Sequence, residues 1–269
     1  MKLLDISEVQ NMQLQLMKKL HYFLIDNSID YYLIAGSALG TARHQGFIPW
    51  DDDIDVGMFR SDYEKFLSIA NNFCDDYQIQ NFRNVNNCDY GLTRIYFPNT
   101  YIEDNSIEGT CLDKRLYLDI FPLDNIPDNK EQQVEFEKRI RKKKSIIARI
   151  DAKNYNNGKI VLIFKKIVSL MLRPFRQTLL KSFDKLMRKY EYIDTASVCS
   201  LCSQYPFEKQ AMCKEIYGTP ILREFSNCAF YFPEKLDLYL TTLYGNNYME
   251  LPPIEKRRKG HNIYLISEE

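Results

Sequence analysis

The sequence lacks the apolar segments that export or membrane insertion requires. Its first residues, MKLLDISEVQ, carry acidic side chains and no apolar run, unlike a secretory signal. The longest apolar stretch, residues 160–172, is interrupted by Lys165 and Lys166 and is shorter than the roughly 20 residues of a membrane-spanning helix. We therefore expect a cytoplasmic protein without a transmembrane helix.

Metal-binding cysteine and histidine patterns are also scarce. The seven cysteines are an odd number in a chain without an export signal, which favours reduced thiols over disulfides. Cys199 and Cys202 form a CxxC pair, but no second such pair and no histidine pair follows. A zinc site is therefore a weak alternative. Of the three histidines, His21 and His44 are interpreted as structural.

Net charge is absent too, because 36 basic residues balance 36 acidic ones. The balance is not local: residues 138–189 contain 17 Lys or Arg against two acidic residues. Two interpretations remain open. The cations alternate with apolar residues, as in helices that bind an anionic membrane peripherally, or the apolar residues pack on the core while the cations are solvated. Nucleic-acid binding is disfavoured, because the segment has few aromatic residues for base stacking.

Helices and strands alternate in the first half of the chain. A hydrophobic content of 45% is sufficient for a buried core. Ser7 and Gln10 form a capping-box pattern at the start of a helix that ends near Asn27. The other expected elements are strands at 30–36, 53–58, 77–82, 91–97 and 116–121, and helices starting at residues 37, 61 and 233.

The predicted organisation is a single catalytic domain over residues 1–269. Residues 1–127 form its core, which ends near a turn-rich loop, PLDNIPDN. Residues 128–192 form a basic helical insertion, with expected breaks at NYNNG and near Pro174. Residues 193–269 form a C-terminal lobe and a basic tail. No internal repeat divides the chain further.

Four aspartates occur within DDDID, residues 51–55. On a strand, Asp53 and Asp55 point to the same face, which Asp51 shares and Asp52 does not. Clustered carboxylates destabilise a fold unless a cation neutralises them, and oxygen ligands favour Mg²⁺ or Mn²⁺. An EF-hand loop is excluded, because Val56 occupies the position that requires glycine. The pattern predicts a divalent-metal site at Asp53 and Asp55, with Asp51 beside them.

Two further features place phosphate chemistry next to these aspartates. Gly36 allows close approach of the backbone, and Ser37, as the expected N-cap of a helix, adds a hydroxyl to an anion pocket of backbone amides. Asp119 lies among apolar residues in LYLDIF, where an unpartnered charge is costly. It either completes the metal site or takes a proton from an attacking hydroxyl. Asp124 is interpreted as a structural turn residue.

Three segments together resemble the LicD family of phosphotransferases, distant relatives of fukutin and the fukutin-related protein. They are GSALGTARHQGFIPWDDDIDVGM, LDIFPLD and YGNNYMELPPIEKRRKGH. The resemblance implies an α/β (α+β), nucleotidyltransferase-like fold: a mixed sheet flanked by helices, with the basic helical insertion and a C-terminal helical lobe. It also implies transfer of a substituted phosphate, typically phosphocholine from CDP-choline, to a hydroxyl of a cell-surface glycan, such as lipopolysaccharide or teichoic acid, or of its lipid-linked precursor.

The resemblance also assigns roles to individual residues. Asp53 and Asp55 look like the metal ligands, with Asp51 next to them, and Gly36 and Ser37 look like the phosphate loop. The remaining implied contacts to phosphate or nucleotide are Arg43 and, in the tail, Lys256, Arg257, Arg258 and His261. Quaternary ammonium groups favour aromatic cages, for which Tyr90 and Tyr96 are candidates.

Alternative functions remain at this point. Relatives in the family use CDP-glycerol or CDP-ribitol. A glycosyltransferase that uses a DxD motif and a nucleotide sugar is disfavoured, since only about 50 residues precede the aspartates and such motifs follow a longer nucleotide-binding region. A nucleotidyltransferase that moves the nucleotide itself is a further alternative. A non-catalytic scaffold is disfavoured, because it has no physical need for buried like charges.

Overall fold

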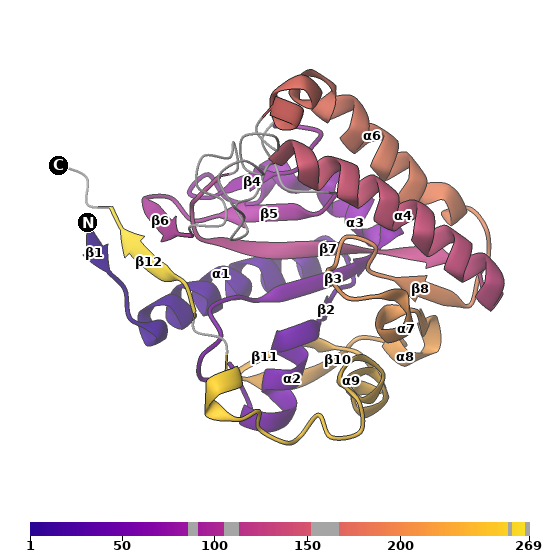
Figure 1. Ribbon diagram of the computed structural model, residues 1–269. Coiled ribbons are helices and arrows are strands. Elements are labelled where there is room, and N and C mark those ends of the chain that lie inside the picture. The colour runs from indigo at the N-terminus through magenta and orange to yellow at the C-terminus, as the bar shows by residue number, and fades with distance from the viewer. Residues whose placement is uncertain (86–90, 105–112, 152–166, 258–259, 267–269) are drawn as a thin grey trace.

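The computed structural model describes residues 1–85, 91–104, 113–151, 167–257 and 260–266. Its centre is a seven-stranded mixed sheet (Figure 1). Five strands follow the order β2 (Tyr32–Leu33), β3 (Asp55–Phe59), β7 (Tyr117–Ile126), β5 (Thr93–Tyr96) and β4 (Gln78–Gln80). The end of β7 also pairs with β8 (Ser197–Cys199), which pairs with β9 (Met212–Cys213). Only β3 and β7 are parallel among these pairs.

Helices flank this sheet, which confirms the predicted fold class. They are α1 (Ile6–Asp26), α2 (Ala35–His44), α3 (Arg60–Ile69), α4 (Lys130–Asp151), α6 (Arg176–Met187), α7 (Phe207–Gln210), α8 (Lys214–Tyr217) and α9 (Leu236–Tyr244). Single 3₁₀ turns occupy Ala70–Asn72, Arg173–Phe175, Arg188–Tyr190 and Ile254–Lys256. In the view of Figure 1, α4 and α6 lie side by side above the sheet, and α2 and α9 lie below it. No helix in the described ranges has both the length and the apolarity of a membrane span.

Two small sheets were not predicted. The chain's beginning and end meet in one of them, where β12 (Asn262–Leu265) pairs with both β1 (Lys2–Leu3) and β6 (Thr100–Glu103). The other is the hairpin of β10 (Ile221–Phe225) and β11 (Cys228–Phe232). The pairing with β6 therefore holds the segment after the polar tail next to the start of the chain.

The helix starts differ from those expected. The capping box of α1 consists of Asp5 and Glu8, so the prediction of Ser7 and Gln10 was wrong by two residues. Asp5 accepts a hydrogen bond from the Glu8 amide at 2.9 Å, and the Glu8 side chain accepts one from the Asp5 amide at 3.0 Å. The prediction that Ser37 caps α2 was also wrong, because the N-cap is Ile34 and Ser37 lies within the helix.

The apolar side chains of the basic helices are buried. Those of α4 and α6 form a second core with β7, β8 and the segment after β8, which includes Phe136, Ile140, Leu180, Phe183 and Met187. For these two helices the structure therefore agrees with packing on the core. The expected break near Pro174 is a 3₁₀ turn. The break expected at NYNNG lies outside the described residues.

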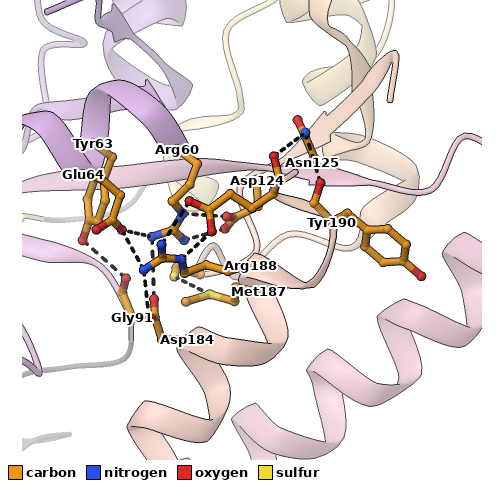
Figure 2. Close-up of polar contacts among 12 residues, drawn as sticks. Arg60, Tyr63, Glu64, Gly91, Asp124, Asn125, Asp184, Met187, Arg188 and Tyr190 are labelled. Carbon is orange, nitrogen blue, oxygen red and sulfur yellow. Dashed lines mark hydrogen bonds and ion pairs between the residues drawn. The ribbon is translucent and has the colours of Figure 1, made fainter. Parts of the chain in front are cut away.

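Strand β7 is longer than predicted, because the expected loop PLDNIPDN is largely strand up to Ile126. Asp124 was interpreted as a turn residue, which was wrong: it is only 1% exposed and accepts hydrogen bonds from Arg60 Nε at 2.7 Å and Nη2 at 2.8 Å. Asp184, from α6, lies 3.6 Å from the same guanidinium. Figure 2 shows this network, which joins α3, β7 and α6.

Candidate active site

A cavity of about 770 Å³ lies beside the parallel strands β3 and β7 and the start of α2. This volume is typical of sites for small-molecule ligands. Its charged lining consists of the carboxylates Asp51, Asp53, Asp55, Asp104, Asp113 and Asp119, the cations Arg94 and Lys256, and the imidazole of His261. The cavity therefore has an excess of negative charge and brings together all the predicted metal-site aspartates.

Sheet register places two of these aspartates side by side. Asp55 of β3 pairs with Asp119 of β7, and Asp119 pairs on its other side with Arg94 of β5. Arg94 Nε donates to Asp119 Oδ1 at 2.8 Å, and its guanidinium lies 3.8 Å from the centre of the Tyr117 ring. Asp119 thus stands between a like charge and an opposite one. Sequence analysis did not identify Arg94, which has no motif of its own.

The carboxylates repel one another inside the protein. Burial, followed by the charges of Asp55 and Asp51, raises the pKa of Asp53 well above its usual value. Burial and the charge of Asp119 do the same to the pKa of Asp55. The ionised cluster therefore needs either protons or a cation to offset this repulsion.

The donor atoms fit a hard divalent cation. Among the described residues, Asp51, Asp52 and Asp53 are a set of three whose ligand atoms all lie within 4.8 Å of one another. Asp52 is already engaged, however, because its Oδ2 accepts hydrogen bonds from the His261 amide at 2.8 Å and contacts His261 Nδ1 at 3.0 Å. We therefore place the candidate ligands at Asp51, Asp53 and Asp55, which share the cavity. Carboxylate oxygens are the ligands that Mg²⁺ and Mn²⁺ prefer.

Gly36 lines the cavity because a larger residue would not fit there. A β-carbon at this position would lie 2.7 Å from Asp51 Oδ2. The neighbouring Ser37 is buried, and its Oγ accepts a hydrogen bond from the Asp55 amide at 3.1 Å. The structure thus gives Ser37 a positioning contact to the acidic strand.

Two glutamines of α1 hold the acidic loop and were missed as site residues. Gln10 Nε2 donates to the carbonyl of Asp51 at 2.9 Å. Gln13, which is fully buried, donates to the carbonyls of Asp52 at 3.2 Å and Tyr117 at 2.9 Å. These bonds fix the loop next to β7. The available signal was Gln13 itself, a polar residue four positions after Val9 on the apolar face of the helix.

The predicted cationic residues divide into two groups. Lys256 and His261 line the cavity. Arg43 donates to the carbonyl of Glu250 at 3.0 Å, and Arg257 donates to the carbonyl of Pro252 at 3.1 Å while its guanidinium lies 4.6 Å from the centre of the Trp50 ring. Arg258 lies outside the described residues. Phosphate or nucleotide contacts by these side chains stay predictions.

Several aromatic rings line the cavity, and Tyr96 is not among them. Tyr90 lies outside the described residues, and Tyr96 is buried under Arg115, 5.0 Å from the ring centre to the guanidinium. The cavity instead has Trp50, Tyr117, Phe121, Tyr205, Tyr217, Tyr239 and Tyr244. The rings of Tyr205 and Tyr244 are nearly perpendicular, with centres 6.2 Å apart.

The structure does not favour the zinc alternative. Among the described residues, no cysteine joins a set of three potential metal ligands. Cys202 Sγ instead contacts Met187 Sδ at 3.4 Å, and burial raises the pKa of the Cys202 thiol to about 12. His21, expected to be structural, lies in the core with its Nδ1 2.6 Å from the hydroxyl of Tyr31.

Comparison with known proteins identifies the class of this enzyme. Residues 28–149, which include the DDDID motif of residues 51–55, match the family described as LicD/FKTN/FKRP, nucleotidyltransferase domain. Over 268 residues the chain is 28% identical to the lipopolysaccharide cholinephosphotransferase LicD of Haemophilus influenzae, covering 98% of each chain. These similarities confirm the resemblance to the LicD family seen in the motifs, and they support a phosphotransferase enzyme.

Two shorter similarities are to uncharacterized proteins of Rickettsia. The chain is 45% identical over 69 residues to a protein of Rickettsia typhi, covering 25% of this chain and 22% of the other. It is 50% identical over 48 residues to a protein of Rickettsia prowazekii, covering 18% of each.

Proposed function

We propose that this enzyme transfers phosphocholine from CDP-choline to a hydroxyl of lipopolysaccharide or of its lipid-linked precursor. The observation that carries the proposal is the cavity of nucleotide size in which Asp55 and Asp119, from two parallel strands, meet Asp53 from the loop before β3. The choice of choline and of lipopolysaccharide is supported by the similarity, along almost the whole chain, to an enzyme named for that reaction.

Asp53 and Asp55, with Asp51 beside them, would hold Mg²⁺ or Mn²⁺. Bound there, the ion would neutralise the diphosphate of the donor and stabilise the charge that develops on the leaving CMP. An anionic donor would otherwise be repelled by the acidic lining of the cavity. Arg94 and Lys256 supply further positive charge, and His261 contacts the carboxylate of Asp52.

In the reaction, the acceptor hydroxyl oxygen bonds to the choline-bearing phosphorus, and the bond from that phosphorus to the bridging oxygen breaks. CMP leaves with the electron pair of that bond. Asp119 stands next to Asp55, where it serves either as a third metal ligand or as the base that takes the hydroxyl proton. The two roles differ in one measurement: Asp119→Asn weakens Mn²⁺ binding only if Asp119 is a ligand.

Aromatic side chains support choline over glycerol or ribitol. A quaternary ammonium group binds to aromatic faces, and Tyr205 and Tyr244 lie close to the carboxylates in the same cavity. CDP-glycerol and CDP-ribitol are the alternative donors, and a nucleotide sugar would be the donor of a glycosyltransferase. None of these neutral groups gains from an aromatic cage in the way that choline does.

A donor panel tests the proposal. The purified chain is incubated with lipopolysaccharide and CDP-choline, CDP-glycerol, CDP-ribitol or a nucleotide sugar, with Mg²⁺ or with EDTA. We expect CMP release from CDP-choline, a phosphocholine mass on the glycan, and loss of both in EDTA. Transfer from another CDP-alcohol would change the assigned donor. Release of a nucleoside diphosphate from a nucleotide sugar would replace the proposal with glycosyl transfer.

We also propose peripheral contact with an anionic membrane through the segment before α6. The apolar side chains of Ile167, Leu170, Met171 and Phe175 are more than half exposed there, next to Arg173. Such a surface would bring the enzyme to a lipid-linked acceptor. Co-sedimentation with vesicles containing anionic lipid is expected at low salt and is expected to weaken in Leu170→Ser/Met171→Ser. The absence of binding at low salt would contradict this contact.

A further inference from the structure

A second cavity, of about 360 Å³, adjoins the active-site cavity. It lies between α4 and the segment 200–207, which follows β8. The two cavities share one wall, formed by Ser200, Cys202, Ser203, Gln204 and Tyr205. A molecule bound in the second cavity can therefore reach the first across this wall, which we call the 200–205 wall.

The backbone of the 200–205 wall is held by neighbouring helices. Lys144 of α4 donates from Nζ to the carbonyls of Cys202, at 3.2 Å, and Ser203. Gln210 of α7 donates to the carbonyl of Tyr205 at 2.8 Å. Because these bonds use main-chain oxygens, they fix the wall without using the side-chain groups of Ser200 and Gln204.

Polar side chains line the second cavity, and one of them, Ser200, lacks a hydrogen-bond partner in the described part of the chain. Ser200 is 6% exposed, and its hydroxyl has no hydrogen-bond partner among the described residues. A buried hydroxyl of this kind costs free energy unless a ligand satisfies it. Gln204 adds an amide to the same wall, and Arg141 adds a guanidinium from α4. The side chain of Arg141 is 69% exposed, so it remains accessible beside its ion pair with Glu137.

Apolar and aromatic side chains also line the second cavity. Ile140 and Phe207 lie among the polar groups, and Tyr205 faces both cavities. A sugar ring has a matching chemistry, because its hydroxyl groups require donors and acceptors at the edge while its C–H face packs on aromatic rings. The donor diphosphate fits this cavity less well than the first, because both cations of the lining are already engaged, Arg141 with Glu137 and Lys144 with main-chain carbonyls.

We infer that the second cavity binds the acceptor saccharide of the transfer reaction and presents one of its hydroxyls across the 200–205 wall to the donor phosphorus. The inference rests on the proposed function and adds the place from which the acceptor approaches. Tyr205 links the two sites, because it lines the second cavity and lies close enough to Asp51, Asp53 and Asp55 for their charges to affect its hydroxyl. The donor occupies the carboxylate side, so the attacking oxygen arrives from the other side of the phosphorus, as in-line displacement requires.

The test uses Arg141→Ala and a matched control, Arg139→Ala, which removes the same charge from an exposed position of α4 outside the cavity. Gln204→Ala is paired in the same way with Gln132→Ala. The acceptor probe is the oligosaccharide core released from lipopolysaccharide by mild acid, and the donor is CDP-choline. Transfer is measured as phosphocholine on the oligosaccharide, and CMP release is followed separately.

We expect the KM for the oligosaccharide to rise roughly ten-fold in Arg141→Ala and Gln204→Ala, as the loss of a hydrogen bond predicts. The KM for CDP-choline should change less than about two-fold in Arg141→Ala, and neither control should affect either KM. An unchanged oligosaccharide KM in both variants, or an equal rise in Arg139→Ala, overturns the acceptor site while transfer by the parent enzyme still stands. If the parent enzyme releases no CMP from CDP-choline, the proposed function fails and the inference fails with it.

Discussion

Strand β7 carries two aspartates in opposite environments, Asp124 buried and Asp119 partly buried at the edge of a cavity. Asp124 accepts two hydrogen bonds from Arg60, so its charge is balanced within the fold. Asp119, five residues earlier, contacts Arg94 but also stands beside Asp55 in a cavity where six carboxylates face two cations and one histidine. At Asp124 the protein itself balances the charge of the strand, whereas around Asp119 carboxylates outnumber cations.

The ion pair of Asp124 stabilises the fold, whereas the acidic cluster around Asp119 is suited to bind a ligand. A buried ion pair loses much stability when one partner is removed, because the other charge is left uncompensated. A cluster of like charges is the reverse case, since removing one carboxylate relieves repulsion. The network of Figure 2 therefore joins α3 and α6 to the sheet, whereas the acidic cavity keeps its charge for a ligand. Substitutions in the ion pair should therefore change stability, and substitutions in the acidic cavity should change activity.

The largest effect is expected on catalysis. Asp53→Asn should lower the rate of CMP release from CDP-choline at least 10³-fold, about 4 kcal/mol of transition-state stabilisation. The melting temperature should stay equal or rise, because a buried like charge is removed. Asp124→Asn is the matched control, because it makes the same change outside the cavity. Full activity in Asp53→Asn would contradict the assigned metal site.

The next effect is on folding. Asp124→Asn should lower the free energy of unfolding by about 3 kcal/mol, because the buried Arg60 loses its bidentate partner and keeps only Glu64 and Asp184 among the described residues. Replacing both residues, as in Arg60→Met/Asp124→Leu, should recover most of that loss. Urea unfolding of the parent protein and the two variants measures both values. A double variant as unstable as Asp124→Asn would show that packing, and not charge, dominates at this site.

A cation should change how stability depends on pH. The folded pKa values of Asp53 and Asp55 lie above their unfolded values, so the folded chain binds protons more tightly in the window between them. Without a divalent cation, stability should therefore fall as pH rises through that window. Saturating Mg²⁺ should raise the stability on the alkaline side, by about 2.7 kcal/mol at 100 times the dissociation constant.

Thermal melts at several pH values, with EDTA or with Mg²⁺, measure this dependence. The variant Asp53→Asn/Asp55→Asn is the control, because it should show neither the pH effect nor the Mg²⁺ effect. Equal stabilisation of this variant by Mg²⁺ would place the ion elsewhere.

The smallest effect concerns Ser37. Ser37→Ala removes the acceptor of the Asp55 amide and should cost about 1 kcal/mol of stability. If positioning is its role, kcat should fall several-fold while the KM for CDP-choline changes little. A rise in that KM with unchanged kcat would instead support the predicted contact between Ser37 and the phosphate. Ser68→Ala, on the exposed surface of α3, is the control.

Local sequence patterns predicted several features of the candidate site. Alternation along DIDV predicted that Asp53 and Asp55 share a strand face. Both line the cavity, but β3 begins at Asp55, so Asp53 reaches the cavity from the preceding loop. Gly36 was expected where the backbone approaches a ligand, and the structure places Asp51 against it. The loop prediction for PLDNIPDN failed because proline and aspartate are typical turn residues. Within β7, Asp124 is stabilised by Arg60 from α3, which no local pattern reveals.

The sequence by itself determined the class of enzyme, the alternation of helices and strands, and the position of the acidic motif, because each depends on residues close together in the chain. Only the tertiary structure decided that Asp119 lies beside Asp55 and Arg94, that Gln13 holds the acidic loop, and that His261 binds Asp52. These contacts join residues distant in sequence. They depend on strand register and helix packing, which are set by the complete fold and not by any local pattern of residues.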